Sequence, residues 1–304
     1  MEDKNTFHSG FVALVGRPNV GKSTLVNKLM KQKIAAVSPR PQTTRRKQLG
    51  ILTSDQAQII FTDTPGVHEA HHKLGEYMNE EALFILQDAD VILWLVDTSA
   101  NPHGDDLLLL DRMKAAKTLP PVILVLNKID LVDESQRENR QKTYTDLLPE
   151  AIPHPISALN GLGVDALLER IINLLPEGPL YFDSEQITDL YEREIAADLI
   201  REAALIHLRD EVPHAIAVRV DQFTERGDTG AKIDATIFVE RDSHKGIVIG
   251  KGGSMLKQIG STARGEIEAM SGRKVYLELR VKVNKNWRND PDALSLLGYT
   301  INKD

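Results

Sequence analysis

The octapeptide GRPNVGKS at positions 16–23 restricts the possible folds of this chain more than any other feature. It matches the pattern G-x-x-x-x-G-K-S, follows the apolar run 11–15 and precedes a segment with helical spacing at 22–30. A glycine-rich turn between a strand and a helix wraps closely around phosphate groups, because backbone N–H groups and the helix N-terminus point at negative charge. The alternative is a glycine-rich turn that matches by chance, and the flanking strand and helix argue against it.

Composition sets outer limits on what the chain can do. At 304 residues it is long for one domain, and a net charge of −7 argues against a surface built entirely for nucleic acid, although a local basic patch stays open. The absence of cysteine excludes disulfides, cysteine-ligated zinc and a cysteine nucleophile, and it suits the reducing cytoplasm. The first ten residues lack an apolar export signal, and the runs 91–96 and 122–126 are too short to cross a bilayer, so we expect neither export nor a membrane span.

Strand and helix patterns alternate through the first part of the chain. Short apolar runs predict strands at 11–15, 59–61, 91–96 and 122–126, with helical spacing at 22–30, 75–86, 105–116, 136–148 and 164–174. This order predicts an α/β domain, with a mainly parallel sheet covered by helices on both faces. Pro176, Gly178 and Pro179 predict a linker at 177–180, so the expected domains are 1–176 and 181–304.

The second part reads as a smaller α+β domain. We expect a helix at 191–209, strands at 216–223 and 232–240, a glycine-rich turn at 250–253, a helix at 254–270 and a strand at 274–283. Its charge is divided: residues 181–240 carry a net charge of −8, whereas 241–290 hold 11 basic and 5 acidic residues, a net charge of +6. The glycine-rich turn lies in the basic stretch, which favours binding to a polyanion.

Two further motifs end apolar strands of the first domain. In the segment DTPG at 63–66, Asp63 can hold a metal ion through water and the Gly66 N–H can reach a γ-phosphate, while Lys22 reaches the β- and γ-phosphates and Ser23 ligates Mg²⁺. In NKID at 127–130, a carboxylate can accept hydrogen bonds from guanine N1–H and the 2-amino group, a pair that adenine lacks. The segment 157–159 would offer a backbone N–H to guanine O6. The ligands predicted are therefore GTP, GDP and Mg²⁺.

The residues predicted to contact the nucleotide come from four loops. They are Gly16, Arg17, Pro18, Asn19, Val20, Gly21, Lys22, Ser23, Thr24, Asp63, Thr64, Pro65, Gly66, Val67, Asn127, Lys128, Asp130, Ser157, Ala158 and Leu159. In this order the motifs resemble the translation-factor-like branch of P-loop GTPases, and QTTR at 42–45 resembles its switch I element. The resemblance implies that Thr44 joins Ser23 and Asp63 around Mg²⁺ in the GTP state, with Thr43 as the competing residue, and that 34–47 and 64–80 respond to the nucleotide.

The group that activates water is less evident. Val67 follows the DTPG glycine where many GTPases carry a glutamine, and valine cannot orient a nucleophile. Similar GTPases use an asparagine at the position of Asn19 to bind K⁺, so we expect slow, K⁺-assisted hydrolysis with Lys22, Thr44 and Asn19 as the catalytic set. A finger supplied by Arg45 or Arg46 is the alternative, and a solvated loop role is favoured for both. For His68, His71 and His72, an exposed polar loop is favoured over a zinc site.

The stretch IVIGKGGSMLKQIG at 247–260 matches the core of a KH domain, in which a G-x-x-G loop between two helices clamps single-stranded nucleic acid. An ordinary helix-turn-helix corner is the alternative. The residues predicted to bind RNA are Ile249, Gly250, Lys251, Gly252, Gly253, Lys257, Arg264, Lys282 and Lys285. We expect Trp287 to pack in the core rather than stack on a base.

Together, GRPNVGKS, QTTR, DTPG, NKID and IGKGG resemble the Era GTPase family over nearly the whole chain. The resemblance implies a bacterial, monomeric switch that binds the 3′ end of small-subunit ribosomal RNA, assists 30S subunit assembly, needs no obligate protein partner and associates peripherally with the inner membrane. Leu159 departs from the frequent lysine, which matters little if a backbone N–H makes the contact. Two alternatives stay open: an RNA-binding assembly scaffold with a structural nucleotide, and a membrane-associated signalling GTPase whose basic stretch prefers anionic lipid.

Overall fold

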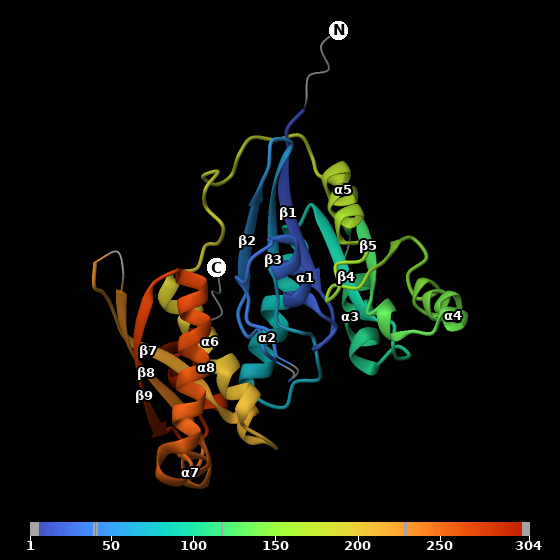
Figure 1. Cartoon of the computed structure of the whole chain (residues 1–304). Helices are drawn as coiled ribbons and strands as arrows, with labels where there is room; N and C mark the ends of the chain where they lie inside the picture. Colours follow the sequence, from blue (N-terminus) through green and yellow to red (C-terminus); the bar gives the residue numbers. More distant parts are fainter. Residues whose placement is uncertain (1–5, 39, 41, 117, 228–229, 300–304) are drawn as a thin grey trace. The chain divides into compact units, whose positions relative to one another are not determined.

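The computed structural model describes residues 6–38, 40, 42–116, 118–227 and 230–299 (Figure 1). Contacts divide the chain into two units. The first contains the residues up to Ala35 together with 44–69 and 78–189. The second contains 36–43, 70–77 and the chain from Leu190 onward. Two short segments of the first half of the sequence therefore group with the second unit, and each unit is described separately below.

The first unit is built on a six-stranded sheet with the order β2-β3-β1-β4-β5-β6. The strands are β1 (His8–Val15), β2 (Gln48–Thr53), β3 (Ala57–Asp63), β4 (Val91–Asp97), β5 (Val122–Asn127) and β6 (Ile152–Pro155). All neighbours pair in parallel except β2, which is antiparallel to β3. This confirms the predicted mainly parallel sheet. The edge strand β2 was not predicted, because its sequence, QLGILT, is interrupted by a glycine and is only half buried.

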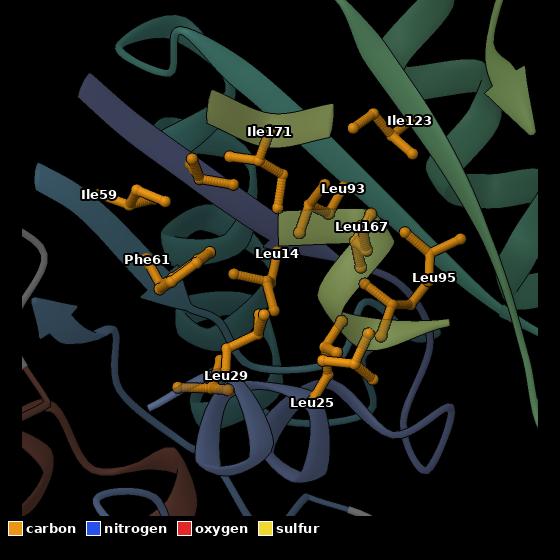
Figure 2. Packing of buried hydrophobic residues seen from close by; sticks show 14 of the residues in the cluster. Leu14, Leu25, Leu29, Ile59, Phe61, Leu93, Leu95, Ile123, Leu167 and Ile171 are labelled. Carbon is orange, nitrogen blue, oxygen red and sulfur yellow. The ribbon is translucent and has the colours of Figure 1, made fainter. Parts of the chain in front are cut away.

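Helices follow the strands in the predicted order. They are α1 (Lys22–Leu29), α2 (Lys73–Phe84), α3 (Gly104–Ala115), α4 (Glu134–Thr145) and α5 (Val164–Leu174). On one face of the sheet, Leu25 and Leu29 of α1 and Leu167 and Ile171 of α5 pack with Leu14 and other strand residues (Figure 2). A second cluster, which includes Trp94, Leu109 and Tyr144, packs residues of α3 and α4 with the alternate strand residues. The central strands β1, β3, β4 and β5 are buried on both faces, which explains their continuous apolar runs.

The order of the strands determines where a ligand can bind to the sheet. Strand β1 lies between β3 and β4, so the chain leaves β1 toward one side of the sheet and later continues on the other. Open α/β sheets bind ligands at the carboxyl ends of the strands, where such a reversal leaves a crevice. The loops that follow β1, β3, β5 and β6 all leave this same edge, because these strands run in one direction.

The boundary between the units lies at Asp189 and Leu190, later than the predicted linker at 177–180. The Pro-Gly segment does end α5, but the chain beyond it stays hydrogen-bonded to the first unit. Gln58 Oε1 accepts the N–H groups of Tyr181 and Phe182 at 2.7 and 3.0 Å, and the Ile51 N–H donates to the Ile187 carbonyl at 2.9 Å. The proline and glycine residues predict where the helix ends. They do not predict that the chain beyond keeps its hydrogen bonds to the first unit.

The second unit has a three-stranded sheet with the order β7-β8-β9. Strands β7 (Ala217–Glu225) and β8 (Gly230–Val239) are antiparallel, whereas β8 and β9 (Lys274–Val283) are parallel. The parallel pair is connected through α7 (Asp242–Ile249) and α8 (Ser254–Ser271), as a parallel connection requires a crossover. α6 (Glu192–His207) packs with α8 over the sheet, and their core contains Ile200, Ile237 and Ile259. The short α9 (Pro291–Leu296) lies beyond the predicted elements.

Candidate functional site

The loop 16–21 joins β1 to α1, and its last glycine permits the close approach on which the loop depends. Gly21 has φ 104°, and a Cβ atom there would lie 2.3 Å from Asn127 Nδ2. The buried Lys22 begins α1, and its Nζ donates to the carbonyls of Gly16 at 2.9 Å and Arg17 at 3.1 Å. Burial lowers the pKa of Lys22 to about 8, against the opposing charge of Asp63. Phosphate oxygens could replace these carbonyls and hold the lysine charged.

The side chains of Ser23, Thr44 and Asp63 meet beside the loop, and we call them the oxygen cluster. Ser23 Oγ lies 2.9 Å from Thr44 Oγ1, and both hydroxyls donate to Asp63 Oδ2, at 2.7 and 3.1 Å. Burial raises the pKa of Asp63, although Lys22 and these hydrogen bonds oppose the effect. Asp63 Oδ1 is buried and has no hydrogen-bond partner among the described residues. Two hydroxyls and one carboxylate, whose Oδ1 is unsatisfied, fit a hard divalent cation such as Mg²⁺.

The two neighbouring threonines differ in what they contact. Thr44 Oγ1 belongs to the oxygen cluster, whereas Thr43 Oγ1 donates to the Arg40 carbonyl at 2.9 Å. The structure therefore brings Thr44, and not its competitor, to the cluster. Arg45 is only 3% exposed, so the expected solvated role is wrong for this arginine, because a buried guanidinium is not solvated.

The DTPG segment packs directly against the phosphate-binding loop. The Thr64 hydroxyl donates to the Leu14 carbonyl at 2.7 Å, and the Val67 N–H donates to the Gly16 carbonyl at 3.3 Å. A Cβ atom on Gly66 would lie 2.5 Å from the Pro18 nitrogen, so only glycine fits without movement. Val67 is 1% exposed and belongs to the core, so its side chain offers nothing to an attacking water.

Of the three histidines that follow, His68 and His72 contact nearby backbone groups and His71 is exposed. His68 Nδ1 lies 2.9 Å from the Gly66 carbonyl, and His72 Nδ1 accepts the Gly75 N–H at 2.9 Å. In the described ranges, no three His, Cys, Asp or Glu side chains are grouped so that they could hold a metal ion.

Asn127 connects NKID at 127–130, which we call the guanine motif, to the phosphate-binding loop by a hydrogen bond. Its Nδ2 donates to the Val20 carbonyl at 2.7 Å, and its Oδ1 accepts the Ala158 N–H at 2.9 Å. Asp130 is exposed in a 3₁₀ turn, Ile129–Leu131, where its carboxylate can meet a base. The N–H groups of Ser157 and Ala158 already donate, to Leu162 and Asn127, so an N–H bond to guanine O6 requires Ala158 to change partner or Leu159 to donate.

Asp97 is a site residue that the sequence analysis missed. It ends β4, and its Oδ2 accepts Lys128 Nζ at 2.7 Å. Burial alone would raise the pKa of Asp97, but the hydrogen bonds from Lys128 and Ser99 outweigh burial and hold the pKa below its usual value. The signal was available, because an acid at the carboxyl end of a parallel strand is the same feature that indicated Asp63.

In the second unit, the G-x-x-G loop lies between α7 and α8. Gly250, Gly252 and Gly253 all have positive φ, and Lys251 points into solvent between them. Lys257 and Arg264 are exposed on α8, and Lys285 is exposed in the loop after β9. Ile249 is partly buried against the core. Trp287 is fully buried and donates its Nε1–H to the Ala215 carbonyl at 3.0 Å, as expected for a core tryptophan.

Lys282 lies apart from these residues. It alternates along β9 with Val281 and Val283, which pack in the helix-covered core, so its side chain projects from the other face of the sheet. Its charge acts there on Asp221. The signal was available in the sequence, because apolar residues alternate with polar ones along 275–283 and place Lys282 opposite the apolar face, whereas the prediction used charge alone.

Comparison with known proteins agrees with this geometry. Residues 11–128 match the family described as 50S ribosome-binding GTPase, and residues 211–288 match the family described as KH domain. The chain is 46% identical over 298 residues to the GTPase Era of Ruminiclostridium cellulolyticum, which covers 98% of this chain and 99% of that relative. It is 49% identical over 297 residues to the GTPase Era of Geobacter metallireducens, covering 97% of this chain and 99% of that relative.

Among solved structures, a crystal structure of Era in complex with MgGDPNP and nucleotides 1506–1542 of 16S ribosomal RNA has a TM-score of 0.92 and 40% identity. The match covers 97% of this chain and 100% of that one. Fold and site thus define a P-loop GTPase that uses Mg²⁺ and carries a C-terminal KH domain. Within this class, the chain belongs to the Era GTPase family. Over the described residues, no helix has the length and apolar character needed to span a membrane.

Proposed function

We propose that this chain binds and hydrolyses GTP in the first unit, binds the 3′-terminal segment of 16S ribosomal RNA through the KH unit, and assists 30S subunit assembly in the cytoplasm. The observation that carries the first part is the oxygen cluster of Ser23, Thr44 and Asp63 beside the buried Lys22. The Era complex with MgGDPNP and 16S ribosomal RNA supports the second part, since that protein covers nearly this whole chain.

The residues of the first unit have different roles in GTP hydrolysis. Lys22 and the loop N–H groups bind the β- and γ-phosphates, and Ser23, Thr44 and Asp63 would hold Mg²⁺, which would neutralise charge on the phosphates. Water attacks the γ-phosphorus, the bond from this phosphorus to the bridging oxygen breaks, the proton of the water passes to the released phosphate, and GDP and phosphate leave. Because Val67 supplies no polar group, these residues act by positioning and by charge rather than by proton transfer.

A monovalent cation is the proposed source of the remaining positive charge. Asn19 is exposed at the turn of the phosphate-binding loop with φ 63°, the position at which similar GTPases bind K⁺. We expect GTP turnover to be about tenfold faster in K⁺ than in Na⁺ buffer, and Asn19→Ala to remove the difference, because one positive charge near the transferred phosphoryl group lowers the barrier by about 1.4 kcal/mol. Phosphate release at saturating GTP measures this, and equal rates in the two buffers would disprove it.

The KH unit binds RNA through the exposed loop between α7 and α8. We expect Lys251→Ala to weaken binding of a single-stranded RNA with the 3′-terminal 16S sequence by about five- to tenfold and to reduce the slope of log affinity against log salt by about one, because one phosphate contact is lost. Lys282→Ala removes the same charge from the other sheet face and should have less than twofold effect. Fluorescence anisotropy at several salt concentrations tests this. Equal losses for both lysines would mean general electrostatic attraction.

The nucleotide is proposed to control RNA binding. Thr44 belongs to the oxygen cluster of the first unit, whereas the residues before it, Ala36–Thr43, group with the second unit. Thr44, which would help to hold Mg²⁺, is directly preceded by this segment, so a change in the position of Thr44 would be transmitted to residues of the second unit through the chain. An RNA titration in the presence of GDP or a non-hydrolysable GTP analogue tests the coupling. Identical RNA affinities in both states, and in Lys22→Ala, would favour the assembly scaffold instead.

A further inference from the structure

A buried acid outside the nucleotide motifs holds a residue of the phosphate-binding loop. Asp106 lies in the first turn of α3 and its side chain is fully buried. Its Oδ2 accepts Arg17 Nε at 3.2 Å and the His103 N–H at 2.9 Å. Its Oδ1 is buried and has no hydrogen-bond partner in the described ranges. Arg17 is the second residue of the GRPNVGKS loop, and its carbonyl accepts Lys22 Nζ.

Arg17 also contacts a second acid, Asp97. Its Nη2 lies 3.7 Å from Asp97 Oδ2, which also accepts Lys128 Nζ at 2.7 Å. Asp106, Arg17, Asp97 and Lys128 thus form a chain of alternating charge, which we call the acid–arginine chain. It joins the start of α3, the phosphate-binding loop and the guanine motif without passing through Asn127.

We propose that Asp106 is a positioning residue for nucleotide binding: it holds the Arg17 guanidinium, and through it the backbone of the phosphate-binding loop, in the arrangement that receives the phosphates. This inference rests on the guanine-nucleotide binding proposed above. An unpaired carboxylate in a buried site raises the free energy of the folded protein. We therefore expect the pairing between Asp106 and Arg17 to keep the two side chains together. A loop that is ordered before binding loses less conformational entropy when the ligand arrives, and its affinity is correspondingly higher.

A purely structural role for Asp106 is the competing explanation, because it also caps α3 through the His103 N–H. Asp106→Asn separates the two. An amide oxygen can still accept the His103 N–H, while the charge that attracts Arg17 is lost. If capping were the whole role, the variant would change the melting temperature of the nucleotide-free protein or nothing at all. A positioning role changes nucleotide affinity instead.

The test measures equilibrium binding of three ligands to the full chain: GDP, a non-hydrolysable GTP analogue and inosine diphosphate (IDP), whose base lacks the 2-amino group. The rate of GTP turnover and the melting temperature of the nucleotide-free protein are measured as well. We expect Asp106→Asn to raise all three dissociation constants about tenfold, since the acceptor for Arg17 Nε loses its negative charge and the effect acts on the phosphates rather than the base. At saturating GTP, kcat should stay within twofold. Asp105→Asn removes the same charge from the same turn, from a residue that contacts Glu69 and His103 but not Arg17, and should stay within twofold throughout.

A second variant keeps the inference testable if Asp106→Asn folds poorly. Arg17→Gln, at a partly exposed position, should reproduce the tenfold loss. In the double variant the two losses should not multiply, because both break the same contact. Wild-type affinity in Arg17→Gln, or fully multiplicative losses, would overturn the proposal. Failure of the wild-type chain to bind GDP would instead overturn the proposed function.

Discussion

Asp130→Asn is expected to lower the affinity for GDP about 1,000-fold and to make xanthosine diphosphate the preferred ligand. The exposed carboxylate of Asp130 can accept hydrogen bonds from guanine N1–H and the 2-amino group. Each charge-assisted bond contributes about 1.5–3 kcal/mol, so the loss of two gives an effect of this size. Xanthine carries an oxygen in place of the 2-amino group, and the asparagine amide can donate to it.

Competition binding of GDP and xanthosine diphosphate to the wild-type and variant chains measures this exchange. Asp133→Asn is a matched control, because Asp133 is an exposed acid three residues further on and its side chain makes no capping hydrogen bond. The assignment of Asp130 to base recognition would be wrong if both ligands lost affinity equally, since that result indicates damage to the loop rather than a change of preference.

Lys22→Ala is expected to reduce GDP and GTP affinity at least about 100-fold and to bring GTP turnover to background. The Lys22 ammonium lies buried in the loop with its donors on the carbonyls of Gly16 and Arg17. Its charge and donors can therefore turn to phosphate oxygens, and charge-assisted bonds of this kind contribute about 1.5–3 kcal/mol each.

The stability of the nucleotide-free variant provides an independent check. Replacing Lys22 with alanine removes a desolvated ammonium, whose pKa falls to about 8, but also removes the positive charge beside the buried Asp63, so the melting temperature of the nucleotide-free variant shows whether lost binding reflects lost folding. Lys28→Ala, an exposed lysine in the last turn of the same helix, serves as the control and should bind GDP normally. Near-normal GDP binding by Lys22→Ala would refute the assignment of this loop.

Much of the fold was predictable because its signals are local. The strands β1, β3, β4 and β5 are continuous apolar runs, since sheets of this kind are buried on both faces. The motifs follow these strands directly, because a parallel sheet places all its ligand-binding loops at one edge. The half-buried edge strand β2 and the short α7 lacked such patterns, so their bounds appeared only in the structure.

The choice of Thr44 over Thr43 shows where local signals end. The resemblance of QTTR to a switch element favoured Thr44, but two adjacent threonines have the same chemistry. Thr43 bonds within its own loop, to the Arg40 carbonyl three residues before it, whereas Thr44 is selected by Asp63, which lies 19 residues further along the chain. Lys282 and Lys251 are both basic and exposed, but Lys251 lies in the loop between α7 and α8, whereas Lys282 lies on a strand, on the face opposite the apolar residues.

By itself, the sequence determined the class of ligand, the order of most strands and helices, and the four loops predicted to bind a guanine nucleotide. These follow from backbone conformations and donor types that a few adjacent residues specify. The tertiary structure alone decided that Asp97 and Asp106 hold Arg17, that Val67 is buried, and that the chain stays with the first unit as far as Asp189. Each of these depends on contacts between residues distant in sequence, which exist only once the chain has packed.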